Sequence, residues 1–247
     1  MSALAVLLVA VGVGDICRGF VGKRWLPPVI GLATLVACAL LAGLWHLGDV
    51  PLLIVAALAC VGWLVSCERA ERTGSRQATP LTVLGIAVVL LILLSGWGSD
   101  VAGLVARWSS WAGLRGIGDI APGRLLMIVG VLLVQAATAN QVVRLILGSV
   151  GSVKPAGEPQ ASDHLKGGRL LGPMERLLIV GLGLAGQLTM ATAVVAAKSI
   201  IRFPEISANR DKNGNPERIG IDDVTEYFLV GSFASWLLAF AGLGLAQ

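Results

Sequence analysis

The chain has 247 residues, of which 55% are hydrophobic and only 14% are charged, and its mean hydropathy is +0.81. Soluble domains carry about 25% charged residues, so this composition excludes an ordinary water-soluble globule and indicates a protein surrounded by lipid. The net charge of +4 comes without a dense basic patch interleaved with aromatic residues. We therefore expect no nucleic-acid partner, and we attribute the basic excess to the loops of a membrane protein.

Seven apolar runs follow one another along the chain, and most reach the roughly 20 residues that a helix needs to cross the hydrocarbon core. The sequence therefore predicts an all-α fold, a polytopic transmembrane bundle of about seven spans. Five runs open with proline, which suits the first turn of a helix because the missing N–H had no partner there. The runs are 3–20 (which contains Asp15), 26–45, 51–66, 81–97, 124–148, 174–201 and 224–246, and the opening prolines are Pro27 with Pro28, Pro51, Pro80, Pro122 and Pro173.

The segment 101–118, between the fourth and fifth runs, has apolar residues at helical spacing with Arg107 and Ser110 opposite them. Because Arg107 and Arg115 make a full span unfavourable, we expect an amphipathic helix lying in the interface; a loop helix packed on the bundle is the alternative. Six tryptophans near the ends of runs are expected in the headgroup layer, and Trp236 is expected to pack inside the protein. The six are Trp25, Trp45, Trp63, Trp97, Trp108 and Trp111.

The polar segment 151–170 is rich in Gly, Ser and Pro and is predicted to be a flexible linker. It would separate an N-terminal transmembrane region, residues 1–150 with about five spans, from a C-terminal helical hairpin, residues 171–247.

Loop charges predict the orientation in a cell membrane. Basic residues concentrate in 17–24 and in 67–79, whereas 46–50 contains none. Because basic loops stay in the cytoplasm, this pattern places the N-terminus outside, and seven spans then place the C-terminus inside.

Gly181, Gly183 and Gly186 form a literal G-x-G-x-x-G, the pattern of a dinucleotide-binding turn. Residues 177–197 carry no charge and no strand–helix alternation surrounds them, so we interpret these glycines as contact points between helices. The segment 209–223 fits a calcium loop in neither register, and histidines and cysteines are too scattered for a metal cluster. We therefore expect no cofactor, no metal and no catalytic residues.

Polar side chains inside the apolar runs are the candidate functional residues, because a charge in a span costs roughly 2.5–3.5 kcal/mol and faces the bundle interior or the interface. Arg176, Gln187 and Lys198 are spaced 11 apart, nearly three turns, and are expected on one face of a single helix. Lys198 is predicted to pair with Glu226, with Arg202 as a competing partner. The candidate network comprises Gln135, Asn140, Gln141, Arg144, Glu175, Arg176, Gln187, Lys198, Arg202 and Glu226.

Three segments of the C-terminal part follow one another in a recognisable order: GRLLGPMERLLIVGLGLAGQ (168–187), AAKSIIRF (196–203) and TEYFLVGSFASWLLAF (225–240). In order and spacing they resemble a family of bacterial multi-pass inner-membrane proteins defined as a domain of unknown function. Members of that family tend to carry an early His-x-x-x-Asp, where this sequence has His46-x-x-Asp49 in a short loop. The resemblance implies a bacterial inner-membrane protein and supplies no reaction.

Three classes of function remain open. The first is a structural or interaction subunit of a membrane complex, with the lipid bilayer around it and a second copy or another protein as partner. The second is a small transporter or channel component, with a polar path along Arg176, Gln187 and Lys198. The third, a membrane enzyme, has the least support because no nucleophile stands beside a base.

Overall fold

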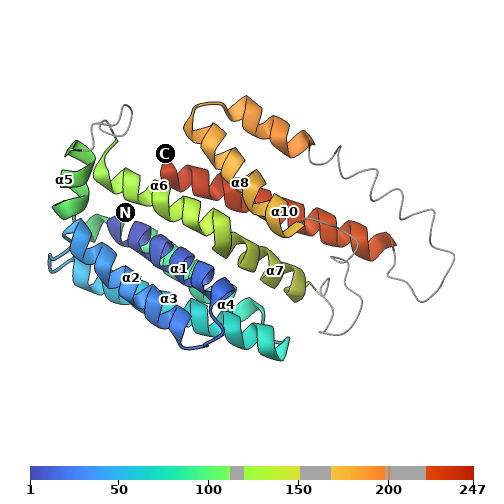
Figure 1. Cartoon of the computed structure of the whole chain (residues 1–247), viewed down its shortest axis with the longest axis horizontal. Helices are drawn as coiled ribbons and strands as arrows, with labels where there is room; N and C mark the ends of the chain where they lie inside the picture. The colour runs from blue at the N-terminus through green and yellow to red at the C-terminus, as the bar shows by residue number, and fades with distance from the viewer. Residues whose placement is uncertain (112–119, 151–167, 198–199, 201–220) are drawn as a thin grey trace. The chain divides into compact units, whose positions relative to one another are not determined.

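The computed structural model describes residues 1–111, 120–150, 168–197, 200 and 221–247, and every regular element in these ranges is helical (Figure 1). The predicted all-α fold is therefore confirmed. The elements are α1 (Ser2–Phe20), α2 (Leu26–Ala42), α3 (Asp49–Thr73), α4 (Ala78–Leu93), the 3-10 turn η1 (Ser95–Trp97), α5 (Gly103–Trp111), α6 (Pro122–Leu133), the π-helical turn η2 (Val134–Thr138), α7 (Ala139–Ser149), α8 (Gly168–Leu184), the helix Leu188–Ala197 and α10 (Ile221–Ala246).

Four stretches of helix in the described chain are long and apolar enough to cross a membrane. They support a membrane location, but they do not confirm seven spans. The predicted spans 26–45 and 81–97 correspond to α2 and α4, which are shorter apolar helices of 17 and 16 residues. The four long stretches are Ser2–Phe20, Asp49–Thr73, Pro122–Ser149 and Tyr227–Ala246.

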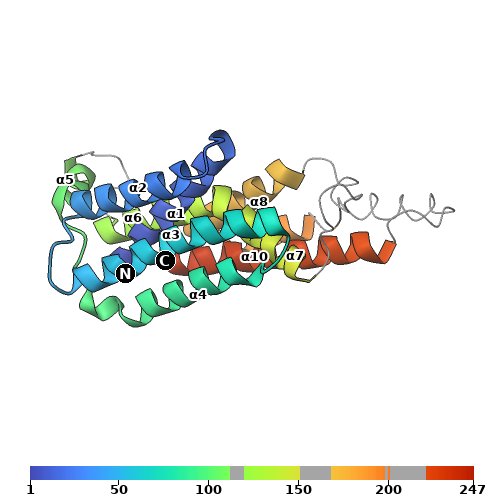
Figure 2. The same cartoon turned by 90° about the horizontal axis from the view of Figure 1, so that it is seen from below.

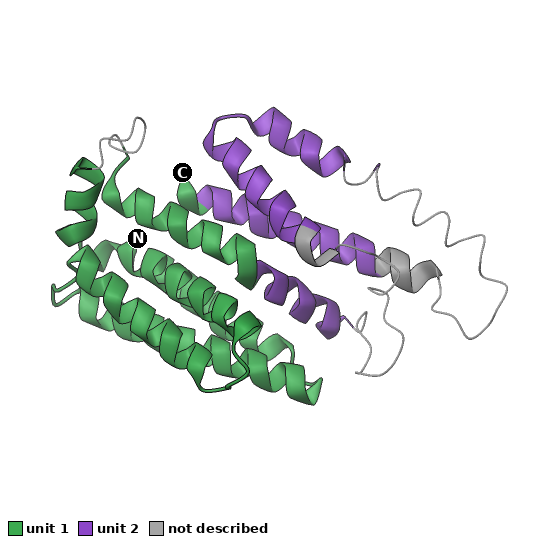
Figure 3. Cartoon of the chain, in the orientation of Figure 1, with its two compact units in different colours: residues 1–138, 245–247 green, residues 139–244 purple. Residues whose placement is uncertain are grey.

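Contacts divide the chain into two compact units (Figure 3). Unit 1 comprises residues 1–138 and 245–247, and unit 2 comprises residues 139–244. Most of the predicted linker 151–170 lies outside the described residues, so that linker and the two regions on either side of it stay predictions.

α1 is the central helix of unit 1 and contacts α2, α3, α6 and η2 (Figure 2). Every residue from Ser2 to Gly12 is buried, whichever side of the helix it faces. Because neighbouring helices and not lipid cover every side of this stretch, α1 forms the core around which the other helices of unit 1 pack.

Two glycines allow α1 and α6 to approach closely. A Cβ on Gly12 would lie 2.7 Å from the Cβ of Leu133, and a Cβ on Gly130 would lie 2.9 Å from the Cβ of Leu8. Both distances are shorter than real Cβ atoms adopt, so only glycine fits at these positions. Such small-residue contacts are how membrane helices gain packing without a hydrophobic driving force.

The predicted helix in segment 101–118 is confirmed for Gly103–Trp111, which form α5. Residues 112–119 lie outside the described ranges. α5 begins beside the end of α2, where the N–H of Ala102 donates to the carbonyl oxygen of Ala42 over 2.9 Å. Gly103 has a positive φ of 59°, which glycine adopts without strain. The place of α5 in a membrane interface stays a prediction.

In unit 2 the predicted span 174–201 is not a single helix, and that prediction is wrong. α8 ends at Leu184, and Gly186 has a φ of +76°. The N–H of Gln187 donates to the carbonyl of Leu182 at 2.8 Å, and that of Gly186 to the carbonyl of Gly183 at 3.1 Å. These two bonds form a Schellman motif, in which a left-handed glycine closes the helix.

The chain folds back after this turn, and the helix Leu188–Ala197 packs beside α8 (Figure 1). Ile179 and Ala191 share one buried cluster with Ala239 of α10. On a continuous helix, residues 12 positions apart would be separated by about 18 Å. Of the three glycines predicted to be helix contacts, Gly183 is one, since a Cβ there would collide with Leu243. A Cβ on Gly181 or Gly186 would meet no atom of the described chain within 4 Å, so for these two the prediction is wrong. Pro173 was expected to open a helix and instead lies inside α8.

Candidate functional site

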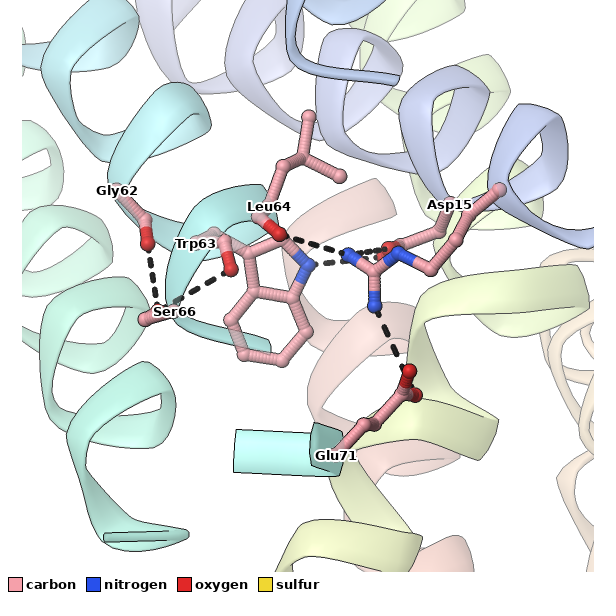
Figure 4. Close-up of polar contacts among 7 residues, drawn as sticks. Asp15, Gly62, Trp63, Leu64, Ser66 and Glu71 are labelled. Atoms are coloured by element: carbon pink, nitrogen blue, oxygen red, sulfur yellow. Dashed lines mark hydrogen bonds and ion pairs between the residues drawn. The ribbon is translucent and has the colours of Figure 1, made fainter. Parts of the chain in front are cut away.

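One buried polar cluster of unit 1 is centred on Asp15 of α1, whose side chain is only 4% exposed (Figure 4). The indole Nε1 of Trp63 donates to Asp15 Oδ2 over 2.9 Å, and Arg18 Nη2 lies 3.0 Å from Asp15 Oδ1. Trp63 is fully buried, so its predicted place in the headgroup layer is wrong. The cause is the length of α3: this helix continues to Thr73, which puts Trp63 well inside it.

Arg18 joins Asp15 to the surface of the unit. Its Nη2 donates to the carbonyl of Leu64 over 3.4 Å, and its Nη1 lies 3.9 Å from Glu71 Oε1. The three ionised side chains differ in exposure: 4% for Asp15, 19% for Arg18 and 30% for Glu71. Arg18 therefore lies between two carboxylates, one buried and one partly exposed.

The turn η2 adds uncharged polar groups to the interior of unit 1. Gln135 and Thr138 are both buried, with 1% and 0% of their surface exposed. The Thr138 hydroxyl neighbours the carboxylate of Asp15, but it has no partner at hydrogen-bonding geometry among the described residues. π-helical turns are rare in proteins, and those that occur are often at functional sites, so η2 is a candidate position for function.

A second buried carboxylate, Asp49, fixes loops at the other end of the unit. It accepts hydrogen bonds from the N–H of Ser99 (2.8 Å), the hydroxyl of Ser99 (2.6 Å) and the N–H of His46 (3.1 Å). Ser2 continues the cluster by donating to the carbonyl of Ser99 over 2.8 Å. Because Asp49 opens α3, its charge also complements the positive end of that helix dipole.

In unit 2, Arg176 links three helices although its surface is only 2% exposed. Its Nη1 donates to the hydroxyl of Ser235 on α10 over 3.0 Å, and its Nη2 donates to Asn140 Oδ1 on α7 over 2.5 Å. The neighbouring Glu175 accepts a 2.7 Å hydrogen bond from Nε1 of Trp236. Trp236 also packs against the buried cluster of Ile179, as expected from its place inside a run.

The structure brings together three of the candidate residues, Asn140, Glu175 and Arg176, around the junction of α7, α8 and α10. Gln187 lies at the turn after α8 and is exposed, so it does not share a continuous helix with Arg176, and that expectation is wrong. Of the others, Gln135 belongs to unit 1, Gln141 is half-buried and Arg144 is exposed on α7, whereas Lys198, Arg202 and the side chain of Glu226 lie outside the described residues.

Asp15 and Arg18 were not among the candidates, although a carboxylate inside an apolar run was a usable signal. Within the described ranges, no three His, Cys, Asp or Glu side chains gather as metal ligands. In the Asp15 cluster, a buried carboxylate is paired with a cation, Arg18, that has a second carboxylate, Glu71, within reach. Arg18 could therefore exchange one carboxylate for the other.

No protein-family model, no curated protein and no solved structure matches this chain. The resemblance of 168–187, 196–203 and 225–240 to a bacterial inner-membrane family stays a prediction.

Proposed function

We propose that this chain is a multi-pass integral membrane protein that acts as a structural or interaction subunit of a membrane complex. The observation that carries the proposal is the bonding of Arg176. A charge that serves a solute has to be reachable, whereas the guanidinium of Arg176 is buried and donates to side chains of two neighbouring helices. Polar bonds of this kind hold membrane helices in one arrangement.

The surface that we assign to the partner is an apolar groove on α10. It is lined by Phe228, Leu229, Val230, Ser232, Phe233 and Trp236. Apolar area alone does not drive association in lipid, but a notch at a small residue lets another helix approach closely. The groove is lined by the small residue Ser232, which is itself buried, and by the exposed side chains of Leu229 and Phe233. We assign a transmembrane helix of the partner subunit to this groove.

Photo-cross-linking in native membranes tests this assignment. A photoreactive residue replacing Leu229 or Phe233 is expected to give adducts that contain a second protein. The matched controls are Val36 and Leu40, which are exposed apolar residues of α2 and should react with lipid. Lipid adducts alone at all four positions would refute the proposal. A protein adduct of twice the chain mass would identify the partner as a second copy.

One observation favours the alternative, a small transporter or channel component. Binding sites of transporters lie where helices end within the membrane, and α8 ends at Leu184 inside the apolar run, with Gln187 exposed in the turn that follows. A Gln187→Cys variant in sealed vesicles separates the two functions. Labelling by an impermeant thiol reagent from both sides of the membrane would indicate an aqueous path and favour transport, whereas labelling from one side only would favour the subunit.

We also propose a cytoplasmic location for the end of unit 1 that carries the basic loops. Arg24, in the loop after α1, lies 3.4 Å from Glu68 near the end of α3, so the loops 21–25 and 74–77 share one end. Lys23, Arg69, Arg72 and Arg76 are exposed at this end. The positive-inside bias supports this orientation. The location of the C-terminus depended on a count of seven spans and stays a prediction.

A further inference from the structure

We propose that Asp15 is a proton-binding site at which a proton and Arg18 compete for the same carboxylate. This inference goes beyond the proposed role as a subunit and does not depend on it. It is carried by the contacts of Asp15, by the two carboxylates around Arg18 and by the Thr138 hydroxyl.

The first state is the one that the structure contains. In this state we assign a negative charge to Asp15, because Arg18 Nη2 lies 3.0 Å from Oδ1 and the Trp63 indole donates to Oδ2 over 2.9 Å. A carboxylate that is 96% shielded in this way is stable only while its charge is compensated, because an isolated buried charge is very costly. Either a cation or a proton can supply that compensation.

The second state requires a new partner for Arg18, and Glu71 provides it. The 3.9 Å between Arg18 Nη1 and Glu71 Oε1 would shorten to a charge-assisted hydrogen bond after a small side-chain movement. The carbonyl of Leu64, already 3.4 Å from Nη2, remains as a second acceptor. Arg18 can therefore leave Asp15 without losing all of its partners.

The second state also requires an acceptor for the O–H of protonated Asp15. Thr138 is fully buried beside this carboxylate, and its Oγ1 makes no hydrogen bond of regular geometry within the described chain. A threonine hydroxyl has two lone pairs and can accept the new donor after a small adjustment. The indole of Trp63 continues to donate to the other oxygen, so protonation leaves no polar atom of Asp15 unsatisfied.

The exposure of the cluster indicates where the proton enters. Glu71, Arg18 and Asp15 become progressively more buried in that order. Asp15 precedes the end of α1 at Phe20 by five residues, which is about 8 Å along the helix. The proton therefore reaches Asp15 from the end of unit 1 that carries the basic loops.

The other titratable groups around Asp15 come from α3 and are Cys60, Cys67 and Glu71. α2 and α4 carry no charged residue, and Cys38 is the only titratable group of α2. α6 carries only Arg124, whose Nε donates to the carbonyl of Ala246. Among the described groups around this cluster, Asp15 is thus the acid that would take the proton, and Arg18 is the cation that would respond to it.

The step is a proton transfer without redox chemistry. A hydronium ion or a buffer acid gives up its proton, and an O–H bond forms at Asp15 Oδ1. Arg18 keeps its charge and moves to Glu71, so the cluster gains one positive charge.

Infrared difference spectroscopy of the full chain in lipid vesicles, titrated between about pH 8 and pH 5 where folded proteins are generally most stable, tests the proposal. The wild type is expected to develop the carbonyl band of a buried protonated carboxyl group. Asp15→Asn should lose that band, whereas Asp49→Asn, which changes another buried carboxylate in the described part of unit 1, should keep it. A band that survives in Asp15→Asn, or no band in the wild type, would overturn the proposal.

Thr138 supplies a second test that does not require Asp15→Asn to fold. Thr138→Val removes the acceptor, and we expect proton binding to weaken by about three- to tenfold, in line with the loss of one hydrogen bond. Thr138→Ser keeps the hydroxyl and should restore the wild-type titration. Identical titrations of the Val and Ser variants would show that Thr138 does not accept the proton of Asp15 and would contradict the mechanism.

Discussion

Trp63 donates its indole N–H to the carboxylate of Asp15 across 2.9 Å, although 48 residues separate the two in the chain. The bond joins α1 to α3 inside unit 1, where both side chains are almost inaccessible. Hydrogen bonds to charged groups contribute about 1.5–3 kcal/mol, more than bonds between neutral groups. This contact is therefore a principal polar link between the central helix and a neighbour.

Trp63→Phe keeps an aromatic ring but removes the donor to Asp15. We expect the free energy of unfolding in detergent to fall by about 2–4 kcal/mol, since a hydrogen bond to a charge and some packing volume are lost together. Trp25→Phe is the matched control, because Trp25 is exposed, and it should change stability by less than about 0.5 kcal/mol. Equal effects of the two variants in a denaturant titration would show that the bond adds no stability.

Replacing glycine by alanine should lower the unfolding free energy at one position, Gly12 of α1, and raise it at another, Gly85 of α4. In Gly12→Ala the new Cβ meets Leu133, and we expect a loss of about 1–3 kcal/mol of unfolding free energy from overpacking. In Gly85→Ala the Cβ meets no atom of the described chain within 4 Å, and the higher helix propensity of alanine should raise stability by up to about 1 kcal/mol. Parallel denaturant titrations measure both. A loss at Gly85 equal to that at Gly12 would mean that the close contact with Leu133 does not explain the loss at Gly12.

Much of the helical framework is predictable from the sequence, because apolar run length determines where a helix can lie in lipid. The run 3–20 corresponds to α1, and 26–45 contains α2. The break after α8 was not predicted. An apolar helix in a membrane tolerates glycine, so Gly186 resembled a packing residue, and only the two hydrogen bonds of the turn identify it as a helix end.

For the candidate sites too, the sequence predicts single charged residues but not the residues that they contact. Arg176 was predicted because a charge in an apolar run is costly, and the structure buries it. Its partner Ser235 could not be predicted, since a serine in a span has no feature that distinguishes it from other small residues. For Asp15 the charge was visible, but Trp63 and Thr138 come from distant helices and become neighbours only through packing.

Arg176→Lys tests whether the fork of donors holds unit 2 together. Lysine keeps the charge but cannot reproduce the planar geometry that serves Ser235 and Asn140 at once. We expect a loss of about 1.5–3 kcal/mol in unfolding free energy, the contribution of a hydrogen bond to a charged group. Arg107→Lys on the exposed surface of α5 is the control and should change stability by less than about 0.5 kcal/mol. An equal, small effect in both variants would remove the structural role that we assign to Arg176.

We predict the orientation of unit 1 from the chemistry of its two ends. Exposed basic residues gather around the loops after α1 and α3, whereas Trp45 and Trp97 are exposed beside the loops at the opposite end. That end is identified by the proximity of Gly48 to the Trp97 carbonyl. Because basic loops remain in the cytoplasm, residues near 22 and 75 should face inward and residues near 47 outward.

Single cysteines at Gly22, Ser75 and Leu47 test this in intact cells with an impermeant thiol reagent. All three positions are exposed, and the wild-type chain gives the background because its four cysteines lie within helices, partly or fully buried. We expect labelling of Leu47→Cys, and labelling of Gly22→Cys and Ser75→Cys only after the membrane is opened. α3 has 25 residues and is about 37 Å long, so Leu47 and Ser75 are separated by more than the thickness of the hydrocarbon core. The two positions should therefore lie on opposite sides of the membrane, and each serves as the control for the other. The reverse pattern, with 22 and 75 labelled in intact cells and 47 protected, would invert the orientation and place the entry to Asp15 on the outside.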